Sequence, residues 1–134
     1  MLRPETRARA RALQLLYAWE LQGRPDLGPV ANALGSGGPG ADQRAVALAR
    51  AVAADAARLD AEIAVAVEHW RMERIGVVER VILRLGVREL MDGAVPAPVA
   101  ISEAVRLAHW FAGPRAPAFI NGVLDAIARR LGRL

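Results

Sequence analysis

The chain has 134 residues, of which 54% are hydrophobic and 4% aromatic, and it contains no cysteine. That length fits one domain with a sizeable apolar core, and the lack of cysteine excludes disulfides, thiol nucleophiles and cysteine-based metal sites. All 18 basic residues are arginine and the formal net charge is +4, which permits a polyanionic partner without requiring one. The N-terminus does not resemble a secretory signal and no apolar run could span a membrane, so we expect a cytoplasmic protein without membrane contact.

A helix over residues 4–22 is the first expected element. Pro4 suits a first helical turn, and Gly23 followed by Pro25 should stop the helix. At about 100° per residue, its small and apolar side chains form one broad face. This face comprises Ala8, Ala12, Leu15, Leu16 and Trp19. We therefore expect the helix to dock on the core by this face.

Glycine and proline dominate residues 23–41, where only residues 27–34 could form a short helix. The segment is too short to separate two domains, so it is interpreted as a surface loop within a single domain covering residues 1–134. Asp42 is a good cap for the next element, in which apolar residues recur at helical spacing down to about His69. This pattern predicts one long alanine-rich helix.

Three further helices are expected in the second half, over residues 77–91, 99–111 and 118–131, and glycine and proline mark the breaks between them. Apolar residues cover most of the circumference of the helix over residues 77–91, as is typical of a helix at the centre of a fold. No strand pattern is found. The sequence therefore predicts a compact all-α domain of six or seven helices.

Catalytic side chains are scarce. The chain has no lysine or cysteine, and its two histidines, His69 and His109, lie near expected helix ends without the spacing of metal ligands. Glu79, Glu89 and Glu103 lie on expected helices, where we expect them to pair with arginines. Neither a phosphate-binding glycine loop nor a dinucleotide fingerprint is present. We therefore expect no enzyme activity, no cofactor and no metal.

Arginines gather at the start of the first helix. Arg3, Arg7 and Arg11 fall on one stripe, and Arg9, on another side, is expected to reach round from the helix start. Two interpretations fit this stripe equally well. It is either a solvated face that keeps the protein soluble or a surface that binds the phosphates of a nucleic acid.

Aromatic residues flank the last predicted break. Phe111 ends one helix, Phe119 opens the next, and Arg115 lies between them. Single-stranded RNA is held by arginine at its phosphates and by aromatic rings under its bases, so this corner suits RNA. The alternative is that both phenylalanines simply pack in the core.

Four motifs in a fixed order resemble those of the NusB family, the bacterial transcription antitermination factors. The motifs are RARALQLLYAWEL, VERVILRLGVREL, VPAPVAISEAVRLAHWF and FINGVLDAIA. The resemblance covers essentially the whole chain except residues 23–41, which look shortened and rich in glycine. Each motif alone is an ordinary amphipathic helix, and it is their order that makes the match specific.

The resemblance implies a compact all-helical protein that binds the boxA element of single-stranded nascent RNA together with NusE, a small-subunit ribosomal protein. Within the RNA polymerase antitermination complex, this pair would promote read-through in ribosomal RNA operons. The family's RNA contacts carry over to two groups of residues here, the N-terminal arginines and the aromatic corner. The implied RNA-binding residues are Arg3, Arg7, Arg9, Arg11, Phe111 and Phe119, with Arg115 added by its charge. The implied NusE contact involves Glu79, with Arg80 as a neighbour.

Three positions depart from the family pattern. Arg88 replaces a frequent aromatic residue, Ser102 replaces an asparagine, and Arg115 stands where acidic and serine residues are familiar. A positive charge at Arg115 favours phosphate but loosens sequence selection, because charge contacts position a strand whereas base-edge contacts specify it. Two alternatives compete with this function. A module of an RNA-modifying enzyme conflicts with the short chain, whereas a helical protein–protein adaptor or homodimer without sequence-specific RNA binding stays open.

Overall fold

The computed structural model describes residues 3–27, 39–68 and 74–134, and all the regular secondary structure in these ranges is helical. Six helices are described, which confirms the predicted all-α class. Most of the expected short helix over residues 27–34, and also His69, lie outside the described residues. The chain divides into two compact units, Met1–Ala54 and Asp55–Leu134. No helix in the described ranges is long and apolar enough to cross a membrane.

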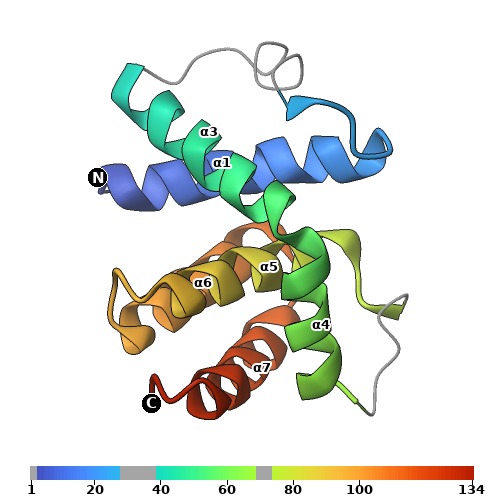
Figure 1. The fold of residues 1–134 in the computed structure, drawn as a ribbon, viewed down its shortest axis with the longest axis vertical. Coiled ribbons are helices and arrows are strands. Elements are labelled where there is room, and N and C mark those ends of the chain that lie inside the picture. Colours follow the sequence, from blue (N-terminus) through green and yellow to red (C-terminus); the bar gives the residue numbers. More distant parts are fainter. Residues whose placement is uncertain (1–2, 28–38, 69–73) are drawn as a thin grey trace. The chain divides into compact units, whose positions relative to one another are not determined.

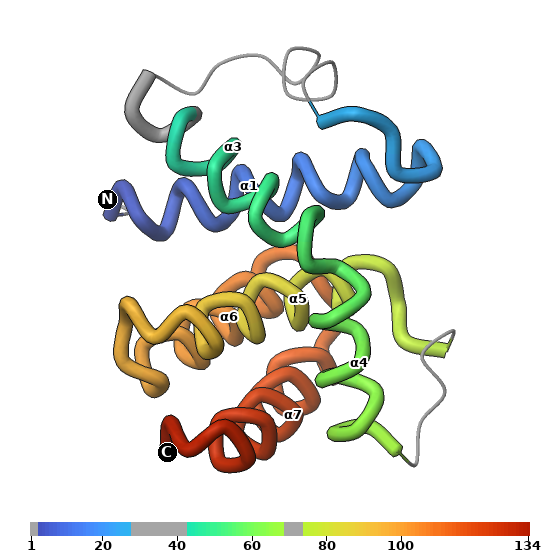
Figure 2. The backbone as a smooth tube through the Cα atoms, in the orientation of Figure 1, coloured from blue at the N-terminus to red at the C-terminus, as the bar shows by residue number. Residues whose placement is uncertain are grey.

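The first unit contains α1 (Pro4–Leu21) and α3 (Pro39–Ala54), which pack against each other (Figures 1 and 2). The apolar face predicted for α1 is confirmed, since all five of its residues are buried. On α3, Ala45, Ala49 and Val52 are buried at spacings of four and three residues, which places them on one side of the helix. Side chains this small allow two helices to approach closely.

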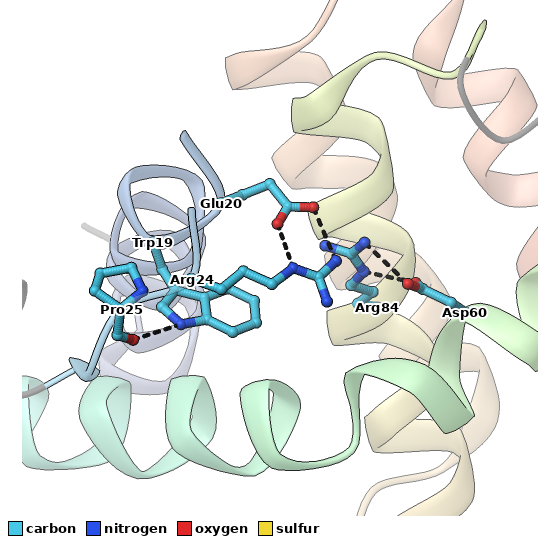
Figure 3. Close-up of polar contacts among 6 residues, drawn as sticks. All are labelled: Trp19, Glu20, Arg24, Pro25, Asp60 and Arg84. Atoms are coloured by element: carbon cyan, nitrogen blue, oxygen red, sulfur yellow. Dashed lines mark hydrogen bonds and ion pairs between the residues drawn. The ribbon is translucent and has the colours of Figure 1, made fainter. Parts of the chain in front are cut away.

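The end of α1 is closed by local contacts. Gly23 and Arg24 both have left-handed backbone conformations, with φ of 82° and 63°. The Arg24 amide donates a hydrogen bond to the Trp19 carbonyl at 2.8 Å, and the Trp19 indole Nε1 donates to the Pro25 carbonyl at 2.9 Å (Figure 3). The Arg24 guanidinium lies 5.1 Å from the Trp19 ring centroid and donates to Glu20 Oε2 at 2.7 Å. These contacts compensate for the uncommon conformation of a residue other than glycine.

The predicted single helix from Asp42 to about His69 is wrong. α3 ends at Ala54, and α4 (Ala56–Ala66) begins two residues later. Asp55 lies between them with φ −103° and ψ 12°, and its carbonyl accepts a hydrogen bond from the Leu59 amide at 2.9 Å. Asp55 Oδ2 also lies 3.6 Å from Arg88 Nε. The break therefore has its own polar contacts, none of which can be recognised from apolar spacing.

The second unit contains α4, α5 (Val77–Asp92), α6 (Ala97–Phe111) and α7 (Ala116–Arg130). α5 packs against the other three (Figure 1), and every residue from 81 to 87 is buried. The prediction of a core helix is therefore confirmed. α7 approaches α5 closely at Gly86, where an added Cβ would lie 2.7 Å from Leu124 Cδ1.

A buried ion pair joins α4 to α5. Arg84 lies in the middle of α5 and is only 2% exposed. Its Nε donates to Asp60 Oδ1 at 2.7 Å, and its Nη2 donates to Asp60 Oδ2 at 3.1 Å (Figure 3). The two parallel hydrogen bonds satisfy both carboxylate oxygens, which compensates for removing the guanidinium from water.

Candidate nucleic-acid interface

The arginine stripe of α1 lies on the surface. Arg3 and Arg7 are exposed, and Arg11 is partly exposed. The Arg11 Nη1 donates a hydrogen bond to Gln14 Oε1 at 3.1 Å, one turn further along the same stripe. The stripe is thus held on a rigid helix whose other face is buried, and this arrangement can present fixed positive charges to a polyanion.

Arg9 differs from the other three arginines. The expectation that it reaches outward is wrong, because only 8% of the residue is exposed. Its position explains the burial, since Thr6, Ala12 and Leu13, which lie on either side of it on the helix surface, are also buried. An RNA contact by Arg9 stays a prediction, and in this conformation little of its guanidinium is accessible.

Two aromatic side chains are exposed at the end of α6. Phe111 is 40% exposed and Trp110 is 43% exposed, so neither is plain core packing. Their ring centroids are 6.4 Å apart and their planes are inclined by 85°, an edge-to-face contact. Trp110 was missed as a candidate, although it directly precedes Phe111 at a helix end. Both rings leave part of their surface available to a ligand.

A cavity of about 270 Å³ lies where α5 and α7 begin. It brings Glu79 together with Arg115 and Phe119, which come much later in the sequence. The remaining lining residues are Arg74, Ile75, Gly76 and Ala116. Two of the predicted RNA-binding residues therefore share one cavity with the residue expected to contact NusE.

The backbone at the two helix starts positions these side chains. Arg115 directly precedes α7, and Phe119 follows four residues later, so both side chains fall on the same side of the first turn. Gly76 directly precedes α5, and Glu79 is the third helical residue. The Glu79 carboxylate folds back over Gly76, where an added Cβ would overlap Glu79 Oε2. A glycine at this position therefore makes room for the carboxylate.

The other expected partner residue, Arg80, is half-buried. Its Nε is buried and, within the described part of the chain, has no hydrogen-bond partner. Arg74 was missed as a site residue, and its only signal in the sequence is a positive charge shortly before an expected helix start. The described ranges contain no cluster of three or more histidine and carboxylate side chains that could hold a metal ion.

Comparison with known proteins gives a consistent result. The model of the NusB family matches residues 6–129. The transcription antitermination protein NusB of Solibacter usitatus is 41% identical over 133 residues, which cover 93% of this chain and 88% of the relative. The corresponding protein of Sorangium cellulosum is 41% identical over 129 residues, covering 94% of this chain and 92% of the relative.

Solved structures agree with the sequence comparison. The structure of T. maritima NusB has a TM-score of 0.86 and 28% identity, and the match covers 96% of this chain and 93% of that one. A crystal structure of the antitermination factors NusB and NusE in complex with dsRNA contains a chain with a TM-score of 0.81 and 30% identity, matched over 97% of this chain and 99% of that one. The expectation that the chain is not an enzyme is confirmed by these relationships. The ordered helical motifs, the fold and the family match together show that this chain belongs to the NusB family.

Proposed function

We propose that this protein is a cytoplasmic transcription antitermination factor that binds single-stranded RNA of the boxA type. It would act with NusE in the RNA polymerase antitermination complex and promote read-through in ribosomal RNA operons. The observation that carries the RNA-binding part is the cavity in which Arg74, Arg115 and Phe119 meet. Arginine and an accessible aromatic ring at one place are the combination by which proteins hold single strands.

The two kinds of side chain have different tasks. Arg3, Arg7 and Arg11 neutralise phosphates and release counterions, which contributes affinity for any RNA sequence. Phe119 offers a ring on which a base stacks, and this requires a base that is not already paired in a duplex. The combination therefore favours a single strand over double-stranded RNA.

NusE is the proposed protein partner, supported by the related complex of NusB and NusE. Of the two residues implied as its contacts, Arg80 lies on the first turn of α5. Glu79 lines the cavity beside Arg115 and Phe119, so RNA and NusE are alternative ligands for its carboxylate. Titration of NusE against an Arg80→Ala variant should show weaker binding, and undiminished affinity would move the interface elsewhere.

An electrophoretic mobility shift with boxA RNA and with a scrambled RNA of the same composition tests the proposed function. Each RNA is titrated with the protein alone and with equimolar protein and NusE. We expect a shift of boxA RNA at a lower protein concentration than the scrambled RNA, and a further gain with NusE. Equal affinity for both RNAs would show that the protein binds RNA by charge alone, without sequence selection. The absence of any shift would contradict the proposed RNA binding.

The exposed pair of Trp110 and Phe111 favours a second candidate, a helical adaptor or homodimer without sequence-specific RNA binding. Aromatic residues are enriched where proteins dock on one another. Light scattering of the purified protein distinguishes the two candidates. A stable dimer that dissociates on Trp110→Ala and shifts no RNA would support the adaptor.

A further inference from the structure

We infer that Arg133 and Leu134 form a strap, which closes the open end of the α6–α7 pair and holds it against the end of α5. Arg133 contacts α5, and Leu134 lines a cavity together with residues of α6. The strap follows the end of α7, whereas Phe119 lies in the first turn of that helix. The inference therefore does not depend on RNA binding.

The α6–α7 pair is a helical hairpin with only one end closed by the chain. Residues 112–115 join the end of α6 to the start of α7. A cavity of about 430 Å³ is lined by Pro98 and Ile101 from the start of α6 and by Arg129 from the end of α7, so the two helices run antiparallel. The other end of the hairpin has no connecting turn, and the C-terminus lies there, near the turn that leads from α5 into α6 (Figure 1).

A left-handed glycine turns the chain at the end of α7. Gly132 has a φ of 73°, and its amide donates a hydrogen bond to the Arg129 carbonyl at 3.1 Å. The Arg133 amide donates to the Ala128 carbonyl at 2.8 Å, which completes a Schellman motif. The backbone of Arg133 is therefore held in a defined place beside the hairpin.

Arg133 caps α5 from another helix. Its Nη2 donates a hydrogen bond at 3.3 Å to the carbonyl of Met91, in the last turn of α5, where carbonyls lack partners within the helix. The same turn carries Glu89 and Asp92 and no basic residue, so it supplies no positive charge to the negative end of the helix dipole. Arg133 supplies this charge from the end of α7.

Gly93 makes room for the guanidinium. An added Cβ at this position would lie 2.9 Å from Arg133 Nη2 and 3.0 Å from both Cζ and Nη1, so the face of the planar group covers the glycine. Gly93 also has a φ of 74° and ends α5. One glycine thus serves both the helix end and the strap.

Amide hydrogen exchange, followed residue by residue by NMR, tests whether the strap couples the helices. Arg133→Ala changes only α7, yet exchange should become faster at the Gly93 amide, which bonds the Glu89 carbonyl in α5. We expect a roughly fivefold increase, as for the loss of one hydrogen bond and one charge–dipole contact at an exposed site. The Arg80 amide bonds the Gly76 carbonyl at the start of α5, where local opening leaves the strap intact, and should keep its rate.

Two further variants sharpen this test. Arg129→Ala removes the same charge from the last turn of α7 without removing a contact to α5, so it is the matched control and should leave the Gly93 rate unchanged. Gly93→Ala tests the reverse direction, because its Cβ displaces the guanidinium. It should speed exchange at the Arg133 amide by a similar factor, since coupling between two sites is reciprocal.

Leu134→Ala tests the contact with α6. The Ala100 amide bonds the Pro96 carbonyl in the first turn of α6, close in the chain to the residues that share a cavity with Leu134. Its exchange should become about twofold faster, a small effect because Leu134 is 46% exposed. An unchanged rate would overturn the closure of the α6–α7 pair.

The remaining outcomes decide the coupling to α5. Faster exchange at Gly93 in Arg133→Ala, together with faster exchange at Arg133 in Gly93→Ala, supports the strap. An unchanged Gly93 rate in Arg133→Ala overturns it, because Arg133 would then act only within α7. An equal increase in Arg129→Ala also overturns it, since a general loss of positive charge would explain the result.

Discussion

The arginine stripe at the start of α1 and Arg84 in the middle of α5 both belong to helices that bury an apolar face, yet the two differ sharply in exposure. Arg7 on α1 and Arg3, which directly precedes α1, are exposed. On α5, Arg84 is 2% exposed and hydrogen-bonded to Asp60. Other helices pack against α5 on nearly every side. A charged side chain in its middle is therefore removed from water and needs a carboxylate inside the protein. The comparison shows that the exposure of an arginine depends on whether its own side of the helix is covered, as the buried Arg9 on α1 also illustrates, and a covered arginine needs polar partners inside the protein.

The largest effect is expected when the buried pair is broken. Asp60→Ala removes two hydrogen bonds from the buried Arg84 guanidinium, and the free energy of unfolding should fall by about 3 kcal/mol. This is the lower end of the usual range, because the Asp60 side chain is 28% exposed. Urea denaturation measures the loss. The double variant Asp60→Leu with Arg84→Met is the control and should be clearly more stable than Asp60→Ala. A loss below about 1 kcal/mol would show that the pair is not desolvated.

The next effect concerns recognition. If a base stacks on Phe119, Phe119→Ala should weaken RNA binding by about 1 to 3 kcal/mol. Anisotropy with boxA RNA measures this, and circular dichroism verifies the fold. Phe119→Leu keeps an apolar side chain without the ring and should recover little of the affinity. Unchanged binding by a folded Phe119→Ala protein would remove the stacking contact.

A smaller effect, visible mainly in its salt dependence, is expected for the stripe on α1. Combined Arg7→Ala and Arg11→Ala substitutions should weaken binding to all RNA sequences alike. They should also reduce the slope of log affinity against log salt by roughly 0.7 for each phosphate that is no longer neutralised. Arg58→Ala combined with Arg106→Ala removes the same charge elsewhere and is the matched control. An unaltered slope in the stripe variant would assign these arginines to solubility alone.

The smallest effect is expected for an exposed counterpart of the buried pair. Arg129 Nε lies 2.9 Å from Asp125 Oδ2, but the Arg129 side chain is 66% exposed. Solvent and salt screen this pair, so Arg129→Ala should lower the free energy of unfolding by less than about 0.5 kcal/mol. Urea denaturation beside Asp60→Ala makes the comparison direct. A loss as large as that of Asp60→Ala would contradict the role given to burial.

Local signals made much of the fold predictable. Gly93 with a left-handed φ of 74° ends α5, and Pro96 directly precedes α6, so this break was found from sequence. The break at Asp55 was not, because Val52, Ala56, Leu59 and Ile63 continue the same apolar spacing across it. Hydrophobic periodicity reports which side of a helix is buried, and here that side hardly changes when the helix ends.

The candidate site was predictable only where it is local. Arg115 directly precedes α7 and Phe119 lies four residues later in its first turn, so their proximity follows from their short separation in the sequence. Whether they lie near Glu79 depends on how α5 packs against α7. The spacing of residues in the sequence gives no information about this packing. The burial of Arg9 was missed for a related reason, because the long side chain of an arginine can lie on a packed face while its charge suggests solvent.

The burial of α5 also has a consequence for the time scale on which the protein opens. Every residue from 81 to 87 is buried, and a charged pair fixes the middle of this stretch. Amide hydrogens there should exchange with deuterium only when the whole unit Asp55–Leu134 unfolds, whereas those near the helix ends exchange through local fraying. Hydrogen exchange in α5 therefore measures the global opening of this unit, and the measurement needs no RNA or protein ligand.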